Sequence, residues 1–178
     1  MPTTYRSVFI ALRPQPSPTL QRALGELRTQ ILQSGVEASL VHPDNDHITL
    51  AFLGRPDPRE AMARFQQCTA NLHHTGPLTI MFSHIGAFGS KKFKARVLFA
   101  QPQPHSGLLR VRDAYRSLAD RDQTLHWTLA RARSQSASDW MMEHLVGPYT
   151  LGQAQVGAVH LMANDGSGCY VDLQRIPL

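Results

Sequence analysis

The hexapeptide HITLAF at residues 47–52 returns as HWTLAR at residues 126–131. The bare tripeptide His-x-Thr is weak evidence in a chain with nine histidines, because chance supplies such tripeptides often. Leu-Ala after the tripeptide, in both places, is much harder to obtain by chance. An internal repeat of this kind predicts two related lobes, with equivalent residues on either side of a pseudo-two-fold axis.

Both hexapeptides have the composition of short β-strands. On a strand, successive side chains point to opposite faces, so residues two apart share a face. His47 and Thr49 therefore point the same way, and so do His126 and Thr128. Each strand is expected to present an imidazole beside a hydroxyl.

Around the repeat, runs rich in Val, Ile and Phe alternate with helical periodicity and turn residues. Thr19 is the expected N-cap of the first helix and Asp57 that of the second, whereas the prolines at 14, 16 and 18 cannot continue a strand ladder. The expected strands are 7–12, 37–41, 47–53, 78–82, 85–88, 95–100, 125–131, 155–162 and 170–174, and the expected helices are 20–32, 58–72, 108–118 and 139–146. The predicted fold class is α+β.

The composition indicates an ordinary globular protein. With 178 residues, 42% hydrophobic and 17% charged, the chain is able to bury a core as one bilobal domain over residues 1–178, and a monomer is expected. Its net charge of +5 and pI near 9.7 favour a polyanionic partner, with RNA ahead of a membrane surface. Charge alone does not decide this, since many soluble proteins are as basic.

No cofactor is indicated by the cysteines. Cys68 and Cys169 are far apart and belong to no metal-binding pattern, so two reduced thiols are expected. The apolar run at 8–12 is too short for a signal-peptide core, and nothing else approaches a membrane span. We therefore expect a cytoplasmic protein.

Two such strands facing each other would bring two imidazoles and two hydroxyls to one phosphodiester. A neutral His accepts the proton of the attacking water while a protonated His gives one to the leaving sugar oxygen. An imidazole pKa near 6.5 allows both forms at neutral pH, and hydroxyls with protonated imidazoles stabilise phosphate oxygens, so this chemistry requires no metal.

The two motifs resemble those of the 2H phosphoesterase superfamily, and within it the bacterial RNA 2′,3′-cyclic phosphodiesterase family, also called the 2′-5′ RNA ligase family. The resemblance covers most of the chain. It includes the early strand 8–12, the run Phe52-Leu53-Gly54, Arg131, and Gly168-Cys169-Tyr170 followed by Asp172-Leu173.

The resemblance implies a bilobal α+β fold of two pseudo-symmetric lobes of antiparallel sheet, with helices outside and the active cleft between the lobes. It implies opening of RNA 2′,3′-cyclic phosphates to 2′-phosphomonoesters, with joining of 2′-5′ linkages in some members. It makes His47 the proton donor and His126 the acceptor, with Thr49 and Thr128 at the phosphate.

Further implied roles are base stacking for Phe52 and phosphate binding for Arg131. Strict alternation turns both side chains away from the threonines unless the strands bulge, so core packing competes with these roles. Three residues depart from the family pattern and leave the substrate subclass open: Leu125, Trp127 and Met162.

The remaining histidines lack a partner pattern and are interpreted as solvated or structural: His42, His73, His74, His84, His105, His144 and His160. Lys91, Lys92 and Lys94 are interpreted as a solvated turn, with docking of RNA phosphates as the alternative. A second function class stays open, namely a nucleotide or RNA-end binding module in which the histidine pair binds phosphate without catalysing a reaction. Turnover of a 2′,3′-cyclic nucleotide in EDTA separates the two.

Overall fold

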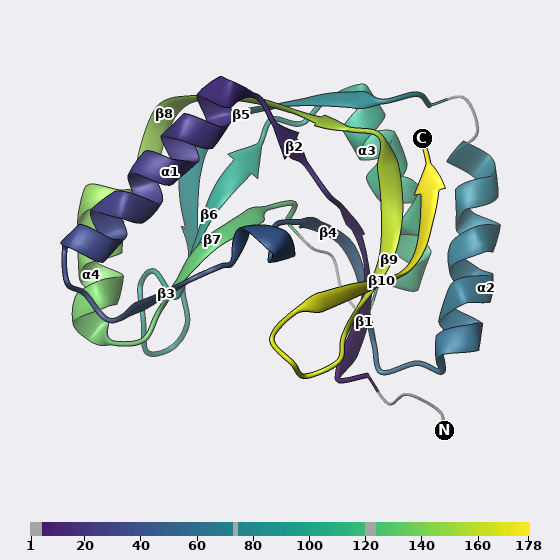
Figure 1. The fold of residues 1–178 in the computed structure, drawn as a ribbon, viewed down its shortest axis with the longest axis horizontal. Coiled ribbons are helices and arrows are strands. Elements are labelled where there is room, and N and C mark those ends of the chain that lie inside the picture. The colour runs from purple at the N-terminus through teal and green to yellow at the C-terminus, as the bar shows by residue number, and fades with distance from the viewer. Residues whose placement is uncertain (1–4, 73–74, 120–123) are drawn as a thin grey trace.

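A computed structural model describes residues 5–72, 75–119 and 124–178. Its strands pair antiparallel in one sheet, in the order β10-β9-β1-β4-β7-β6-β5-β8-β2, with β3 also on β7 (Figure 1). The strands are β1 (Ser7–Leu12), β2 (Gln15–Pro16), β3 (Ala38–Leu40), β4 (Ile48–Gly54), β5 (Leu78–Phe88), β6 (Val97–Pro102), β7 (Trp127–Ala132), β8 (Gly147–Val156), β9 (Ala158–Asn164) and β10 (Tyr170–Pro177). The predicted α+β class is confirmed.

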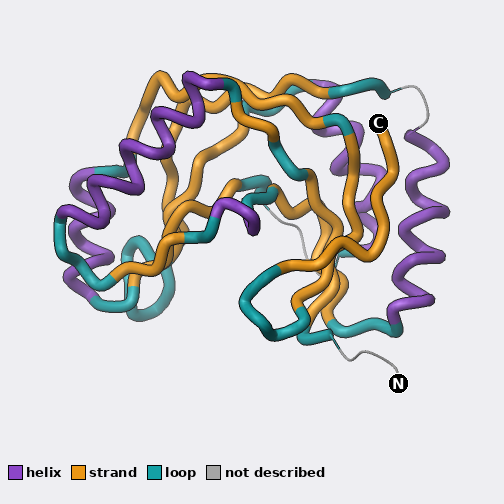
Figure 2. The backbone as a smooth tube through the Cα atoms, viewed as in Figure 1, coloured by secondary structure: helices purple, strands orange, loops and turns teal. Residues whose placement is uncertain are grey.

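The helices lie in two groups. The α-helices are α1 (Pro18–Gln33), α2 (Pro58–Thr69), α3 (Ser106–Tyr115) and α4 (Gln135–His144), and the short 3₁₀ turns are η1 (Pro43–Asn45), η2 (Ala70–Leu72) and η3 (Arg116–Leu118). Helices α1 and α4 pack on the strands β7 and β8, and α2 and α3 pack together near β1 and β4. Figures 1 and 2 show the first pair at one end of the molecule and the second pair at the other.

The sheet is symmetric about its centre. β4 and β7 are neighbours at the middle of the strand order, with β1, β9 and β10 beyond β4 and with β6, β5 and β8 beyond β7. The two lobes interleave in sequence, because α1 follows β1 in the chain but packs on β8 in the other lobe. The repeat therefore marks the axis between the lobes, while the lobes themselves are not the two halves of the chain.

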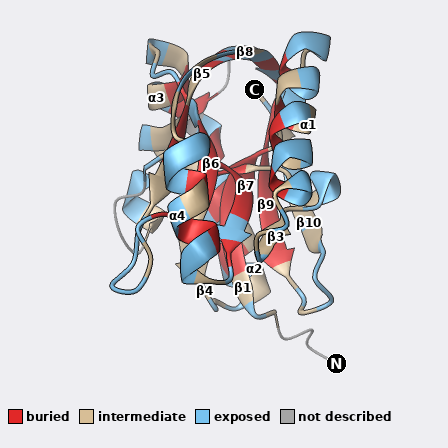
Figure 3. Cartoon of the chain, turned by 90° about the vertical axis from the view of Figure 1, so that its left-hand side faces the viewer, coloured by how far each residue is buried: buried red, intermediate tan, exposed pale blue. Residues whose placement is uncertain are grey.

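The core is built from the apolar faces of the strands and helices. Leu20, Leu24, Leu27 and Ile31 form the buried stripe of α1, as the three-and-four spacing predicted. In Figure 3 the strands are largely buried between helices whose outer faces are exposed. Trp127 is 1% exposed and packs edge-on against Phe82. No helix among the described residues is long and apolar enough to cross a membrane.

Four local predictions are wrong. Ser17, not Thr19, caps α1, since the Ser17 hydroxyl accepts from the Leu20 amide and Pro18 takes the first helical position. Pro16 does lie in a strand, β2, which is tolerated because β2 is the edge of the sheet. The two strands expected within 78–88 are one strand with an irregularity between Phe82 and His84. The single strand expected at 155–162 is the end of β8 followed by β9, and the rest of β8 was not predicted.

Candidate active site

The two His-x-Thr motifs meet where β4 and β7 pair. The residues in register there are Ile48 and Trp127, both buried. Directly opposed residues of antiparallel strands point to the same face, and their sequence neighbours point to the other. His47 and Thr49, and His126 and Thr128, therefore share the face opposite to Ile48 and Trp127. The motifs are placed side by side, as the repeat predicted.

A bulge in each strand places Phe52 and Arg131 on this same face. In β4, Thr49 pairs with Ala11 and Phe52 with Phe9, so the strand carries one residue more than β1 over this stretch. In β7, Thr128 pairs with Phe99 and Arg131 with Val97, again with one extra residue. The strict alternation that turned both side chains away does not hold. Phe52 packs at a small cluster of Phe9, Ala11 and Met162.

Both histidine rings are held in the same way. The Nδ1 atom of His47 lies 2.7 Å from the carbonyl oxygen of Asn45, and that of His126 lies 2.6 Å from the carbonyl oxygen of Thr124. A carbonyl only accepts, so Nδ1 carries the proton in both rings. Each Nε2 is left to gain or lose a proton. Neither Nε2 has a hydrogen-bond partner among the residues that the structure describes.

Aromatic rings support each imidazole. Phe9 and Tyr170 lie 5.0 and 5.1 Å from the His47 ring, centroid to centroid. Phe88 and Phe99 lie 4.8 and 5.4 Å from that of His126. The two pairs come from opposite lobes and repeat the pseudo-symmetry of the sheet. They limit the rotation of both rings, so the Nε2 positions are set by packing as well as by hydrogen bonds.

The two threonine hydroxyls have no partner within the described residues. Thr128 is only 8% exposed and Thr49 is half-buried. A hydroxyl is costly to leave unpaired in a site from which water is displaced. The arrangement thus offers two hydroxyl donors beside two imidazoles, which suits the oxygens of a phosphate.

The environment favours neutral histidines in the free protein. Burial first, and then the charges of His126, Arg13 and Arg131, together lower the pKa of His47 to about 4, while the hydrogen bond to the Asn45 carbonyl opposes this shift. Burial and Arg131 also lower the pKa of His126. The expectation of untuned imidazoles is therefore wrong, because the surrounding apolar rings and guanidinium groups disfavour the cationic form. Arg131 is exposed and acts on both rings.

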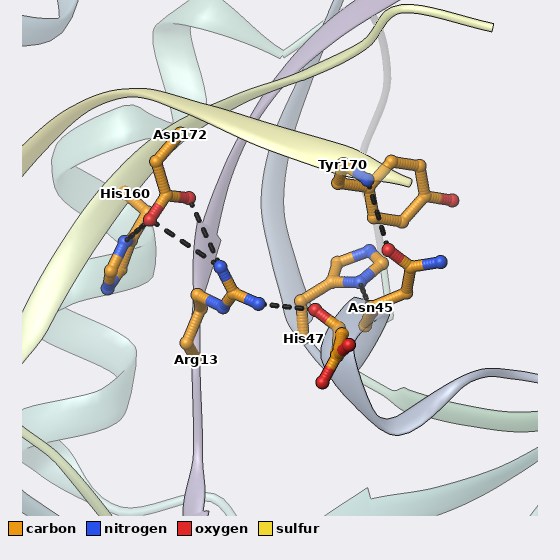
Figure 4. Close-up of polar contacts among 7 residues, drawn as sticks. Arg13, Asn45, His47, His160, Tyr170 and Asp172 are labelled. Atoms are coloured by element: carbon orange, nitrogen blue, oxygen red, sulfur yellow. Dashed lines mark hydrogen bonds and ion pairs between the residues drawn. The ribbon is translucent and has the colours of Figure 1, made fainter. Parts of the chain in front are cut away.

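Sequence reasoning missed a group of polar residues next to His47 (Figure 4). Arg13 donates to the Asp44 carbonyl and lies 3.5 Å from the Asp172 carboxylate, which in turn lies 3.1 Å from the Nδ1 of His160. His160 is 8% exposed and lies on β9, between β1 and β10 in the sheet, so of the two alternatives, solvated or structural, the structural one holds. No local spacing marks this group, since its members come from β9, from β10 and from the segment after β1.

Asn45 joins this group to the face that carries the two motifs. Its backbone carbonyl holds His47, while its side chain donates to the Gly168 carbonyl and accepts from the Tyr170 amide. The loop between β9 and β10 is thereby fixed against the chain segment that carries His47. No group of three or more His, Cys, Asp or Glu side chains is placed to hold a metal ion within residues 5–72, 75–119 and 124–178.

Part of the chain is similar to a known protein family. Residues 12–99, which include the first motif, match the family model of LigT-like phosphoesterases. Comparison with curated protein sequences gave no significant match.

Solved structures match nearly the whole chain. Escherichia coli LigT complexed with 3′-AMP is 22% identical, with 98% of each chain covered and a TM-score of 0.72. The protein TT0787 of Thermus thermophilus is 21% identical, with 97% of each chain covered and a TM-score of 0.72. Usb1 of Kluyveromyces marxianus is 12% identical, with 99% of this chain and 100% of that chain covered and a TM-score of 0.59. These likenesses show a common fold.

Residues 12–99 are thus similar to the LigT-like phosphoesterases, and the solved structures show the same fold over the second motif, which lies beyond the matched residues. The resemblance drawn from the repeated His-x-Thr motifs is confirmed.

Proposed function

We propose that this LigT-like phosphoesterase opens the 2′,3′-cyclic phosphate at an RNA end to a 2′-phosphomonoester, using His47 and His126 as its acid and base and no metal. The observation that carries the proposal is the matched pair of Nδ1–carbonyl hydrogen bonds at 2.7 and 2.6 Å. They fix the same tautomer in both rings and leave two Nε2 atoms on one face of two paired strands. One proton donor and one proton acceptor are what in-line opening of a cyclic phosphate requires.

The reaction balances with these two groups alone. The Nε2 of His126 accepts a proton from water as its oxygen attacks phosphorus. The bond from phosphorus to O3′ breaks, and O3′ receives the Nε2 proton of His47. The phosphate stays on O2′. Proton exchange with water then restores both imidazoles. Following the resemblance, His47 donates and His126 accepts.

The lowered pKa of His47 fits a donor that is charged only with substrate bound. The cyclic phosphate carries one negative charge, and an anion close to an imidazole favours its protonated form. In the free protein this form is disfavoured, with a pKa of about 4 for His47. Substrate binding therefore supplies the charge that burial and the two arginines oppose.

Thr49, Thr128 and Arg131 bind the phosphate oxygens in this proposal. The two hydroxyls are unpartnered among the described residues, and the Arg131 guanidinium is close enough to shift the pKa of both histidines. Phe52 is half-buried on the same face, beside Phe9, where it offers a ring edge for stacking of the terminal base. A 5′-hydroxyl in place of water gives a 2′-5′ linkage by the same steps, which is the ligase reaction of the family.

The test is turnover of a 2′,3′-cyclic nucleotide in excess EDTA, with product identification by ³¹P NMR. We expect a 2′-phosphate as product, at a rate unchanged by the chelator. A 3′-phosphate product, or loss of activity in EDTA, contradicts the proposed mechanism. A module that only binds RNA ends, the alternative, gives saturable binding and no product.

A further inference from the structure

The catalytic face continues past His47 toward β9 and β10. Ala11 pairs with Thr49 on one side and with His160 on the other, and His160 pairs with Arg175. Direct partners share a face, so Thr49, His160 and Arg175 lie in one row across the sheet. Between Thr49 and His160 the row contains only the small, buried side chain of Ala11. The row runs from Thr49 to the imidazole of His160 and the guanidinium of Arg175.

Arg13 connects this row with His47. Its guanidinium donates to the carbonyl of Asp44, and the His47 ring donates to the carbonyl of Asn45, the next residue. The carbonyl groups of two adjacent residues thus hold the side chains of Arg13 and His47. The charge of Arg13 lowers the pKa of His47. In Figure 4, Arg13 lies between His47 and the pair of His160 and Asp172.

Arg13, His160, Asp172 and Arg175 line a hollow of about 810 Å³ that also takes in Arg28 and Asp46. Arg28 and Asp46 are paired at 2.9 Å and neutralise each other. Arg13 lies 3.5 Å from both oxygens of the Asp172 carboxylate, which is a long ion pair. Arg175 is exposed and makes no hydrogen bond or ion pair with the part of the chain that the structure describes. The lining also includes Asp44, so three arginines face three aspartates and the formal charges balance. The Asp44 carboxylate lies in solvent beside His42, which leaves Arg175 as the cation of the hollow without an acidic partner among the described residues.

His160 is oriented into this site. Its Nδ1 is held by Asp172 at 3.1 Å, while its Nε2 has no partner within the described ranges. The ring is 8% exposed. A carboxylate that holds one nitrogen of an imidazole sets the direction of the other. An oriented imidazole and two guanidinium groups thus line the same hollow, and N–H donors of this kind suit the oxygens of an anionic phosphodiester.

We propose that Arg13, His160 and Arg175 form a second phosphate-binding subsite, which holds the phosphodiester one nucleotide upstream of the cyclic phosphate. This inference rests on the proposed function, because it places the cyclic end between His47 and His126. It identifies the substrate as an RNA chain and not a mononucleotide. The RNA backbone leaves the terminal nucleotide through its 5′ oxygen and crosses the buried methyl group of Ala11 to reach Arg175.

The experiment compares binding of two RNA dinucleotides that end in a 3′-phosphate and differ only at the linkage. One carries the natural phosphodiester, the other an uncharged methylphosphonate. We expect the charged linkage to bind the wild-type protein about tenfold more tightly, which corresponds to about 1.4 kcal/mol, near the lower value for hydrogen bonds to charged groups. In Arg175→Gln this ratio falls toward one.

Arg110→Gln is the matched control, since Arg110 is an exposed arginine of α3 that lines neither this hollow nor the His-x-Thr motifs. It removes the same charge and is expected to leave the ratio at its wild-type value. Equal binding of the two dinucleotides to the wild type, or an equal fall of the ratio in both variants, overturns the subsite. Binding needs no turnover, so a protein that prefers the charged linkage but fails to open a cyclic phosphate retains the subsite and loses the proposed function.

Discussion

Replacing Thr49 or Thr128 by Val tests the phosphate site with little disturbance of the fold. Valine keeps the β-branched shape that suits a strand and deletes the hydroxyl. Neither hydroxyl has a partner among the described residues, so no internal hydrogen bond is lost. We expect the free energy of unfolding to change by less than about 0.5 kcal/mol, as for a substitution that touches no structural feature.

The loss is expected in activity. A hydrogen bond to a charged oxygen contributes about 1.5 to 3 kcal/mol, which corresponds to a fall in kcat/KM of roughly ten- to hundredfold for each variant. The assay is hydrolysis of a 2′,3′-cyclic nucleotide, alongside urea unfolding of the same preparations. Thr49→Ser and Thr128→Ser keep the hydroxyl and should retain most of the rate.

Two outcomes refute this reasoning. Unchanged kcat/KM in both Val variants means that the hydroxyls do not meet the phosphate. Unfolding of the Val variants together with stable Ser variants means that the hydroxyls serve the scaffold, contrary to their lack of partners among the described residues.

The remaining predictions concern the ionisable groups. His47→Ala and His126→Ala should each lower kcat about 10²- to 10⁴-fold without unfolding the protein, and a near wild-type rate in either variant contradicts the acid–base assignment. Because the pKa of both histidines is lowered in the free protein, kcat/KM should peak below pH 6.5 and fall at higher pH, where both imidazoles are neutral; a flat profile from pH 5 to 9 excludes a histidine pair. The pKa of His47 is lower in the folded than in the unfolded protein, so the free energy of unfolding should decrease as pH falls from 6.5 toward 4. This decrease should be smaller in His47→Ala, and urea titrations at each pH measure it. Arg131→Gln should move the kcat/KM optimum to higher pH, because Arg131 lowers the pKa of both histidines, and should raise KM; an optimum that stays in place leaves Arg131 no electrostatic role.

The sequence predicted the strands that carry the motifs because their signals are local. A run of β-branched and aromatic residues ending at a turn marks β1, and the repeat marks β4 and β7. β8 escaped prediction because Gly147, Pro148 and Gly152 interrupt its pattern. Gly152 has a φ of 123°, and a Cβ there would lie 3.1 Å from the Leu20 amide nitrogen, so the close crossing of α1 requires glycine. Such a contact between distant residues leaves no local signal.

The electrostatics of the site could not be predicted from the sequence either. The lowered pKa of His47 arises from burial and from arginines at positions 13 and 131, which only the folded sheet brings together. The group of Arg13, His160 and Asp172 joins β9 and β10 to the end of β1 by the same means. Spacing along the chain does not encode these distances, since Arg13 and Asp172 are 159 positions apart and meet through strand pairing.

The repeated Leu-Ala of the two motifs has a physical explanation in the bulges. Leu50 and Leu129 are the residues skipped in the pairing with β1 and β6, and both are buried in the main core. The alanines that follow them are fully buried, where the tightened backbone of a bulge leaves room for a methyl group. With one extra residue inserted, a side chain three positions after the threonine returns to the face of the threonine, as Phe52 and Arg131 do. Leu-Ala thus adds a third side chain in each lobe to the face of the His-x-Thr pair, and this sixth position of the motif differs between the lobes, aromatic in one and cationic in the other.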